Sequence, residues 1–528
     1  MALVFEPVAS SAPADLFRSD VACFVGFVGR RAGRPLPDAL RAQLDAGGWV
    51  TGPWARPAAQ VEDLLDVPLA LDSWHLFDRF YDWDRRAVDP AGTRRCASYL
   101  GAAVRSFFAR GGRRAIVVRV GDPWPVQQDS ATRAAQRAAR LARLLPMGPL
   151  SAPFAPHEPA SWRGAQHLYG LPQASLLLLP DLPDLCAGLP PPPDTARALA
   201  PLPEGFAPCD IEQPQERDTA LLRVPAPRLD AAGYQQWRVA LNSVRGFLAR
   251  HRRSATLLAA MPLPEAGTRS AAGVHAQSEL LAYLQQAGVL AGSTLEDTAQ
   301  GRPAEALSQF AWPWLRTRAA AGDLPQGLEP ADGVLAGLVA QGAVALGTHR
   351  SVAGDRSLAR LRDVGGGEPV PAWGLAPDSP SALLARRVCL FAPQAEGWAL
   401  QSDVSASALD PWRFGGASRL LATLLQAAQR AGDTAVFEPN GPALWARLRG
   451  TLEELLAGFW QAGAFGGATR EQAFSVRCDR STMTQADLDA GRIHAVLQVR
   501  PAMAIEQITV VLQLGHAASV DALAQEMT

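Results

Sequence analysis

Two aspartates that follow an apolar segment have a spacing that could support enzyme chemistry. Asp181 and Asp184 stand in the motif PDLPDL, directly after the apolar run ASLLLLP at residues 174–180. Acidic groups of α/β enzymes often follow a buried strand in this way, so the pair could serve a hydrolase-like or nucleotide-sugar enzyme. Pro-Asp pairs also end strands through turn chemistry, and this structural interpretation stays open beside the catalytic one.

Glu438 is a third candidate acid. It stands in VFEPN, just ahead of a helix expected to begin at Pro442. Pro439 fixes the backbone, and Asn440 or Gly441 can cap the helix, whose amide donors would hold the Glu438 carboxylate. No base, nucleophile or metal ligand accompanies this acid in the sequence. We therefore expect the segment Glu438, Pro439 and Asn440 to be a structural turn.

The composition excludes several other kinds of chemistry. All 50 basic residues are arginine, so the chain has no Walker A lysine and no lysine for a Schiff base. The cysteines form no CxxC pair and the histidines form no HExxH motif, so we expect no metal site and no cofactor. The run Gly365–Gly367 precedes Glu368, which would repel a phosphate, and we expect a loop there.

Charge and cysteine usage bear on partners and location. A net charge of -1 does not favour nucleic acid as a partner. Scattered cysteines are typical of reduced, buried thiols in a protein folded in the cytoplasm. The N-terminal segment lacks the basic region and long apolar core of a signal peptide, and the longest apolar runs are too short to cross a membrane. We expect no membrane insertion.

The acids must be positioned by elements that alternate between helix and strand. Residues 98–110 place apolar side chains on one helical face, Gly111 and Gly112 stop the helix, and a β-branched strand follows. Helix and strand patterns then recur at 130–145, 174–180, 234–253 and 255–263. This order predicts an α/β sheet covered by helices.

The last 120 residues follow a different pattern. An apolar helix at 418–429 and a long helix at 442–462 precede three segments in which apolar residues alternate, AFSVRCD, RIHAVLQV and EQITVVLQL. Two helices and an antiparallel sheet predict a compact α+β domain. The long helix carries a charged face, formed by Arg447, Arg449, Glu453 and Glu454. Such a face could meet another protein rigidly, although a solvated face has the same pattern.

Several motifs resemble contractile tail sheath proteins of phage tails and extracellular contractile injection systems. The C-terminal match comprises VFEPNGPALW, WQAGAFGGATREQAFSVRCDRSTMTQADLDAGRI and VRPAMAIEQITVVLQL. Far upstream, YLGAAVRSFFARGGRRAIVVRVGDP resembles the helix and strand near the start of sheath proteins, and VACFVGFVG with SWHLFDRF resembles what precedes them. Two matches in the family's order make coincidence improbable.

The resemblance implies a structural subunit and not an enzyme. Sheath subunits form hexameric rings that stack helically around an inner tube and contract. Partners would be further copies of the chain, an inner tube protein, and baseplate and terminal cap proteins. The particle would be phage tail-like, assembled in the bacterial cytoplasm, and could be released extracellularly. Strands added to a neighbour's sheet can link such subunits. Here the expected inter-subunit strand is Ile505, Glu506, Gln507, Ile508, Thr509, Val510, Val511 and Leu512.

The resemblance also implies a division of the chain and some specialisation. The expected parts are an N-terminal arm at 1–19, a helix-covered α/β sheath core at 20–125 and 301–410, an inserted outward-facing α/β region at 126–300, a tube-facing α+β domain at 411–514, whose sheet is antiparallel, and a tail at 515–528. The chain opens MALVFEPVASS where the family has a Pro-Gly-Val-Tyr arm, and CLFAPQAEGWAL replaces a Trp-Gly-Ala-Arg-Thr stretch. These changes could mark a ring at the baseplate or the distal cap.

Overall fold

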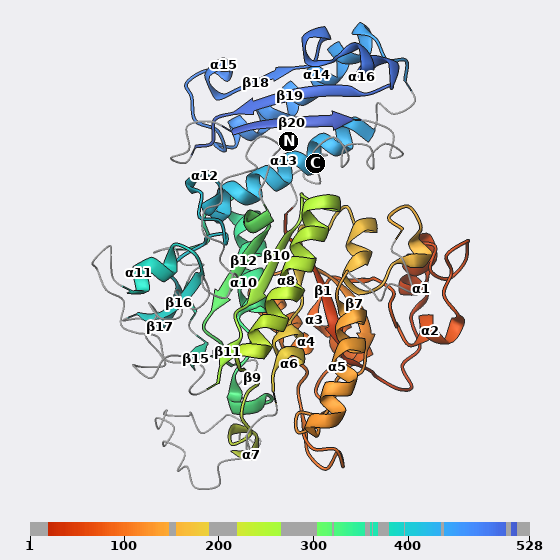
Figure 1. Cartoon of the computed structure of the whole chain (residues 1–528), viewed down its shortest axis with the longest axis vertical. Helices are drawn as coiled ribbons and strands as arrows, with labels where there is room; N and C mark the ends of the chain where they lie inside the picture. The colour runs from red at the N-terminus through yellow and green to blue at the C-terminus, as the bar shows by residue number, and fades with distance from the viewer. Residues whose placement is uncertain are drawn as a thin grey trace, which may run out of the picture.

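A computed structural model gives the fold of most of the chain (Figure 1). It describes residues 19–146, 155–188, 219–265, 304–318, 322–353, 360–361, 363–367, 380–394, 397–433, 438–502 and 508–514. The tail at 515–528 and all but the last residue of the expected N-terminal arm lie outside these ranges. The described residues form two main hydrophobic cores, a large one in an α/β body and a smaller one in a C-terminal domain.

The body is organised around a nine-stranded mixed sheet. The strand order is β14-β17-β16-β12-β10-β8-β1-β7-β3, parallel from β16 to β7 and antiparallel at both margins. The strands are β1 (Val21–Phe27), β3 (Leu69–Leu71), β7 (Arg114–Gly121), β8 (Leu176–Leu178), β10 (Thr256–Ala260), β12 (Ser308–Trp312), β14 (Arg360–Leu361), β16 (Cys389–Gln394) and β17 (Gly397–Leu400). β1 is buried throughout, as expected for a parallel strand covered on both faces.

Strands β8 and β10 lie in the middle of this sheet, between β1 and β12. Both come from residues 126–300, the range expected to form an inserted outward-facing α/β region. β8 pairs with β1 and β10 pairs with β12, whereas two further strands of this range, β9 (Arg228–Leu229) and β11 (Leu263–Pro264), form a small ladder with each other. Apolar runs predict buried strands but carry no information about which neighbour a strand pairs with, so the sequence could not show that β8 and β10 complete the central sheet.

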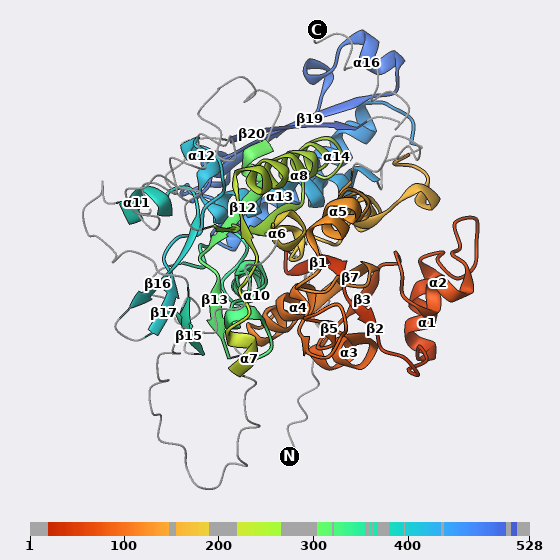
Figure 2. The same cartoon turned by 60° about the horizontal axis from the view of Figure 1, so that its bottom comes forward.

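Helices cover both faces of the sheet (Figure 2). One face carries α4 (Tyr99–Ala109) and α10 (Asp332–Ala345), and the other carries α5 (Ser130–Leu144), α6 (Leu182–Cys186) and α8 (Ala231–His251). The side chains of Ser98, Asp129 and Asp230 cap α4, α5 and α8 by accepting backbone N–H bonds. The α/β sheet covered by helices that the sequence predicts is confirmed.

Short elements surround this core. Small two-stranded ladders are β2 (Gly29–Arg30) with β4 (Tyr81–Asp82), β5 (Arg86–Ala87) with β6 (Arg95–Cys96), β9 (Arg228–Leu229) with β11 (Leu263–Pro264), and β13 (Leu315–Thr317) with β15 (Val364–Gly367). Short helices are α1 (Asp38–Ala46), α2 (Ala58–Glu62), α3 (Trp74–Phe80), η1 (Pro159–Ser161), η2 (Gly164–Gly170), α7 (Thr219–Leu222), η3 (Ala304–Leu307), η4 (Pro325–Gly327), α11 (Pro380–Ala385) and α12 (Asp410–Arg413).

The glycine run at 365–367 is part of strand β15 and not the loop expected from the sequence. Gly367 pairs with Leu315 and Gly366 with Arg316 in an antiparallel ladder. Glycine weakens a strand intrinsically, so local sequence argues against one here. Pairing with β13 overrides that preference, which no pattern within the run itself could indicate.

The C-terminal domain packs two long helices against a three-stranded antiparallel sheet (Figure 1). Its elements are α13 (Gly415–Asp433), α14 (Pro442–Gln461), α15 (Arg470–Ala473), β18 (Phe474–Arg477), η6 (Arg480–Thr482), α16 (Gln485–Asp489), β19 (Ile493–Val499) and β20 (Ile508–Leu514). Every second residue of β19 is buried, which confirms the predicted alternation. Within the described residues, no helix has both the length and the apolarity needed to span a membrane.

Helices α4 and α10 approach each other closely because glycine lines their contact. A Cβ atom at Gly333 would lie 2.5 Å from the Cα and carbonyl oxygen of Ala103, and one at Gly337 would lie 2.8 Å from the carbonyl oxygen of Phe107. Both contacts involve backbone atoms, which cannot move aside as a flexible side chain can. The small residues in VLAGLVAQGAVAL therefore serve packing within the body.

We expect Gly333→Ala to lower the free energy of unfolding by about 1–3 kcal/mol, because the added methyl group forces the two helices apart. Gly246→Ala is the matched control, since an added Cβ at this exposed position of α8 meets nothing within 4 Å. There the better helix propensity of alanine should stabilise the protein by up to about 1 kcal/mol. Urea unfolding followed by tryptophan fluorescence measures both. Equal effects of the two substitutions would contradict the packing account.

Candidate assembly surface

Asp181 and Asp184, the two acids of the PDLPDL motif, lie just after the end of β8 and are buried. Asp184, on α6, accepts a hydrogen bond from Arg86 Nη2 at 2.7 Å and from the Trp124 indole at 2.8 Å. Arg133 on α5 lies 3.4 Å from the other carboxylate oxygen and donates to the Asp184 carbonyl at 2.7 Å. Burial alone would raise the pKa of Asp184, but Arg86 and Arg133 hold it below its ordinary value.

Arginine side chains fill the space around this carboxylate. The Arg133 guanidinium lies 4.1 Å from the centre of the Trp124 ring, and that of Arg86 lies 5.4 Å from the centre of the Tyr99 ring. Arg137 donates to the carbonyls that end α6, those of Leu185 at 2.9 Å and Ala187 at 2.8 Å. The end of the sheet, where α/β enzymes place their substrates, is thus occupied by the protein's own side chains.

Asp181 is closed off in the same way. Its carboxylate accepts the backbone N–H of Phe27 at 2.7 Å, and a Cβ at Gly26 would come within 2.3 Å of the same oxygen. Burial raises the pKa of Asp181 to about 7. Asp181 therefore connects β1 to the start of α6, and Asp184 connects α6 to β5, α5 and the segment after β7; both side chains are buried. Within the described ranges, no group of three or more His, Cys, Asp or Glu side chains could hold a metal ion.

The turn at Glu438 differs in detail from the expected cap. Gly441 occupies the N-cap position of α14 without a side-chain bond, and Pro442 begins the helix. The Glu438 carboxylate forms an ion pair with Arg447, one of the residues of the predicted charged face. Asn440 Oδ1 accepts the indole N–H of Trp445 at 2.7 Å and so fixes the first turn of the helix. Glu438 and Asn440 thus contact side chains of α14, whereas the sequence suggested contact with the helix amides.

The predicted charged face of α14 is exposed along its length. Arg447, Arg449, Glu453 and Glu454 all face solvent, while Leu444, Leu448, Leu452 and Leu456 of the opposite face are buried in the C-terminal core. Arg449 and Glu453 are 3.7 Å apart in an i,i+4 pair. About half of each of these two side chains remains exposed, so the pair adds little stability and leaves its charges available to another protein.

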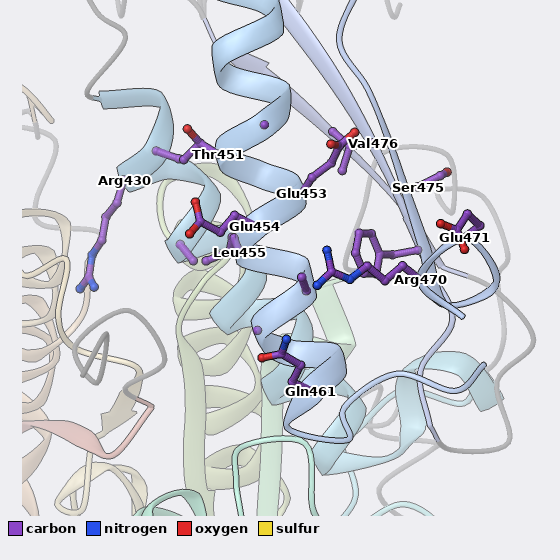
Figure 3. Close-up of a pocket in the computed structure, with 16 residues that line it drawn as sticks. Arg430, Thr451, Glu453, Glu454, Leu455, Gln461, Arg470, Glu471, Ser475 and Val476 are labelled. Atoms are coloured by element: carbon purple, nitrogen blue, oxygen red, sulfur yellow. The ribbon is translucent and has the colours of Figure 1, made fainter. Parts of the chain in front are cut away.

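A groove of about 1350 Å³ crosses this face between α13, α14 and β18 (Figure 3). Small residues, among them Ala427, Gly450 and Ala457, line it. Glu454 points toward the α13 side and Glu453 toward the β18 side of α14 (Figure 3). Arg430, Arg470 and Glu471 also line the groove and were not among the residues predicted from the sequence. They lie on other elements, so no periodicity along α14 could have found them.

The predicted inter-subunit strand lies partly within the described residues. Ile508, Thr509, Val510, Val511 and Leu512 belong to β20, which pairs along its whole length with β19 of the same chain. Ile505, Glu506 and Gln507 lie outside the described residues. The order β18-β19-β20 places β18 and β20 at the two margins of the sheet. An edge strand presents backbone groups that can pair with a further strand.

These features describe an α/β body with a closed sheet end, joined to a small antiparallel domain that carries an exposed charged helix and two edge strands. Chains in solved structures have a similar fold. Two chains in cryo-EM structures of the anti-feeding prophage (AFP) baseplate are similar to this chain. For the 6-fold symmetrised baseplate, the TM-score is 0.52 at 15% identity, over 92% of this chain and 91% of that chain. For the baseplate in the contracted state, the TM-score is 0.51 at 17% identity, over 98% of this chain and 97% of that chain.

A chain of the AFP helical sheath in the contracted state aligns over 96% of both chains, with a TM-score of 0.49 and 16% identity. No family model matches the sequence, and no curated protein matches it. The likeness to the two baseplate chains shows a shared fold over nearly the whole length of the chain. This shared fold stands beside the resemblance to contractile tail sheath proteins found from the sequence motifs.

Three acids of the body are buried without a cation within ion-pair distance among the described residues: Asp181, Glu329 and Asp332. Both Glu329 carboxylate oxygens accept from Ser106 Oγ, at 2.9 and 2.8 Å, and Asp332 accepts the N–H of Gly333 at 2.9 Å. Burial raises the pKa of each to about 7. The folded protein therefore keeps protons that the unfolded chain releases near pH 4.

We expect stability to fall as the pH rises from about 4 to about 7, because the unfolded state loses these protons first. Each group contributes up to about 1.4 kcal/mol per pH unit. Glu329→Gln and Asp332→Asn should each flatten the decline, whereas Glu158→Gln, at an exposed site, should leave it unchanged. Urea unfolding at a series of pH values measures the slope. If the parent and the three variants all show the same decline of stability with pH, the roles assigned to Glu329 and Asp332 would be contradicted.

Proposed function

We propose that this chain is a structural subunit of a contractile sheath. Copies of it assemble as stacked hexameric rings around an inner tube and contract to drive the tube through a target envelope. The observation that carries the proposal is the fold shared with chains of the AFP baseplate over 92% and 98% of this chain. One of those structures is 6-fold symmetrised and the other is in a contracted state, which supports a role in the same kind of assembly.

The closed end of the sheet supports a structural function over the alternative enzyme. A hydrolase-like or nucleotide-sugar enzyme would need Asp181, Asp184 or Glu438 to face a substrate. Asp184 is bound by two arginines, Asp181 by a backbone amide, and Glu438 by Arg447. Each acid thus has a partner in its own chain, and we assign no catalytic role to any of them.

The proposed contacts lie in the C-terminal domain. The face of α14 that bears Arg447, Arg449, Glu453 and Glu454 meets the inner tube or a neighbouring subunit. The strand at 505–512 links subunits by pairing beyond the edge of the sheet, since β20 has β19 on one side and lies at the margin. Main-chain pairing of this kind tolerates large rigid-body rotation of the joined parts, which a contracting lattice requires.

The remaining partners and the location belong to the same proposal. The domain at 411–514 faces the tube, and the body lies farther out. The expected arm at 1–19, apart from its last residue, and the expected tail at 515–528 lie outside the described residues. Baseplate and terminal cap proteins contact the ends of the stack. The chain binds no nucleic acid and does not insert into membranes. The particle is assembled in the bacterial cytoplasm and acts as a released, phage tail-like body.

Deletion of residues 504–528 is expected to abolish rings and tubes, because it removes β20 and with it the edge on which the next strand would pair. Negative-stain electron microscopy of the purified full chain and of the deletion variant measures assembly. Deletion of 515–528 alone is the control, since it keeps β20 and should keep assembly. Tryptophan fluorescence should show that the α/β body stays folded in both. Unchanged rings after deletion of 504–528 would contradict the strand-pairing proposal.

A further inference from the structure

Helix α13 contributes to both halves of the molecule in chemically different ways. Its apolar side chains, Ala417, Leu420, Leu421, Leu424 and Ala428, belong to the C-terminal core, together with the leucines of α14. Within the described residues, none of its side chains belongs to the hydrophobic core of the body. The helix lies between the nine-stranded sheet and the C-terminal sheet (Figure 1). Ala306 of η3 also belongs to the C-terminal core, and the other contacts that fix α13 to the body, described below, are polar contacts and close backbone approaches.

The polar attachment centres on Arg419 and Asp403. Arg419 is 3% exposed and Asp403 5% exposed, and their side chains form a two-pronged pair, with Nη1–Oδ1 at 2.8 Å and Nη2–Oδ2 at 2.6 Å. Burial disfavours both charges, but the pairing holds the pKa of Asp403 below and that of Arg419 above their ordinary values. A bidentate pair between a guanidinium and a carboxylate fixes the relative orientation of the two side chains more strictly than a single charged contact would.

Two other segments of the body contact the same pair. Asp403 also accepts from Gln309 Nε2, on β12, and from the backbone N–H of Val352, both at 3.0 Å. Arg419 Nη2 also donates to the carbonyl of Arg350 at 3.0 Å. The pair thus connects the first turns of α13 to the central sheet and to the segment that follows α10.

The first residues of α13 pack closely against the body. The N–H of Gly415 donates to the Asp403 carbonyl at 2.9 Å, and a Cβ at Gly415 would lie 1.9 Å from Asp403 Oδ1. A Cβ at Gly416 would lie 2.4 Å from the carbonyl oxygen of His349. Farther along, Ser418 Oγ donates to the Ala306 carbonyl at 3.0 Å, and Gln426 donates to that of Pro172.

We infer that α13, clamped by Arg419 and Asp403, is a rigid strut that fixes the orientation of the C-terminal domain relative to the α/β body. The two cores are separate, so without the clamp the C-terminal domain and α13 can pivot together on the segment at 404–414. With the clamp, any force on α14 or on the C-terminal sheet passes directly into the body. This is a property of the isolated subunit and does not rest on the proposed function.

Pulsed electron-electron double resonance measures the distribution of distances between two spin labels and so tests the inference. Val239→Cys on α8 and Gly450→Cys on α14 are suitable positions, because Val239 is 58% exposed and an added Cβ at Gly450 meets nothing within 4 Å. The five described cysteines are buried, and Cys209 is replaced by serine in all variants. Dilution with unlabelled protein restricts the signal to distances within one chain.

The clamp variant is Asp403→Asn with Arg419→Gln, which removes both charges so that neither is left buried and unpaired. We expect one narrow distance peak in the parent and at least a twofold broader distribution in this variant. Amide exchange in residues 415–423 should become at least tenfold faster, while that of α4 stays unchanged. Asp184→Asn is the control, because it disturbs a buried ion pair within the body and should leave the distance distribution narrow.

Arg419→Lys keeps the charge but loses the fork, so it should give an intermediate width. If the double variant does not fold, the width of the distance distribution in Arg419→Lys tests the inference instead. A distribution as narrow as that of the parent in the folded double variant, or in Arg419→Lys when only that variant folds, would overturn the inference. Equal broadening in Asp184→Asn would also overturn it, because general loss of stability would then explain the effect.

Discussion

The buried carboxylate of Asp184 is the point on which the separate segments of the body converge. It binds Arg86 from the β5–β6 ladder, the Trp124 indole from the segment after β7, and Arg133 from α5. A buried carboxylate is costly unless it is paired and hydrogen-bonded, so these partners must come together for the end of the sheet to close. In a chain whose basic residues are all arginine, the fork of the guanidinium makes such multiple contacts possible.

At the closed end of the sheet, where many α/β proteins hold a substrate, the described side chains contact one another instead. The charged face of α14, the groove beside it and the margins of the β18-β19-β20 sheet all lie in the C-terminal domain. A second buried arginine and carboxylate pair, Arg419 with Asp403, connects that domain to the body. Contact surfaces and a rigid body are what an assembling subunit requires.

The sequence predicted the elements better than their connections. Apolar periodicity located α4, β7, α8 and α14 within a few residues, because these patterns follow from burial of one face or of both. It could not show that β8 and β10 pair within the main sheet, since strand neighbours are a matter of tertiary pairing. The exposed face of α14 followed from the same periodicity, whereas Arg430 and Arg470 of the groove lie on other elements and carry no sequence signal.

The central claim is that the chain acts by assembly, with its C-terminal domain toward the tube. A cryo-EM reconstruction of particles formed by the full chain tests this most directly, because it places each helix at a radius from the axis. The account predicts sixfold rings in which Arg447, Arg449, Glu453 and Glu454 of α14 face the central channel. Rings in which α14 lies at the outer radius, or a protein that stays monomeric at every concentration, would contradict it.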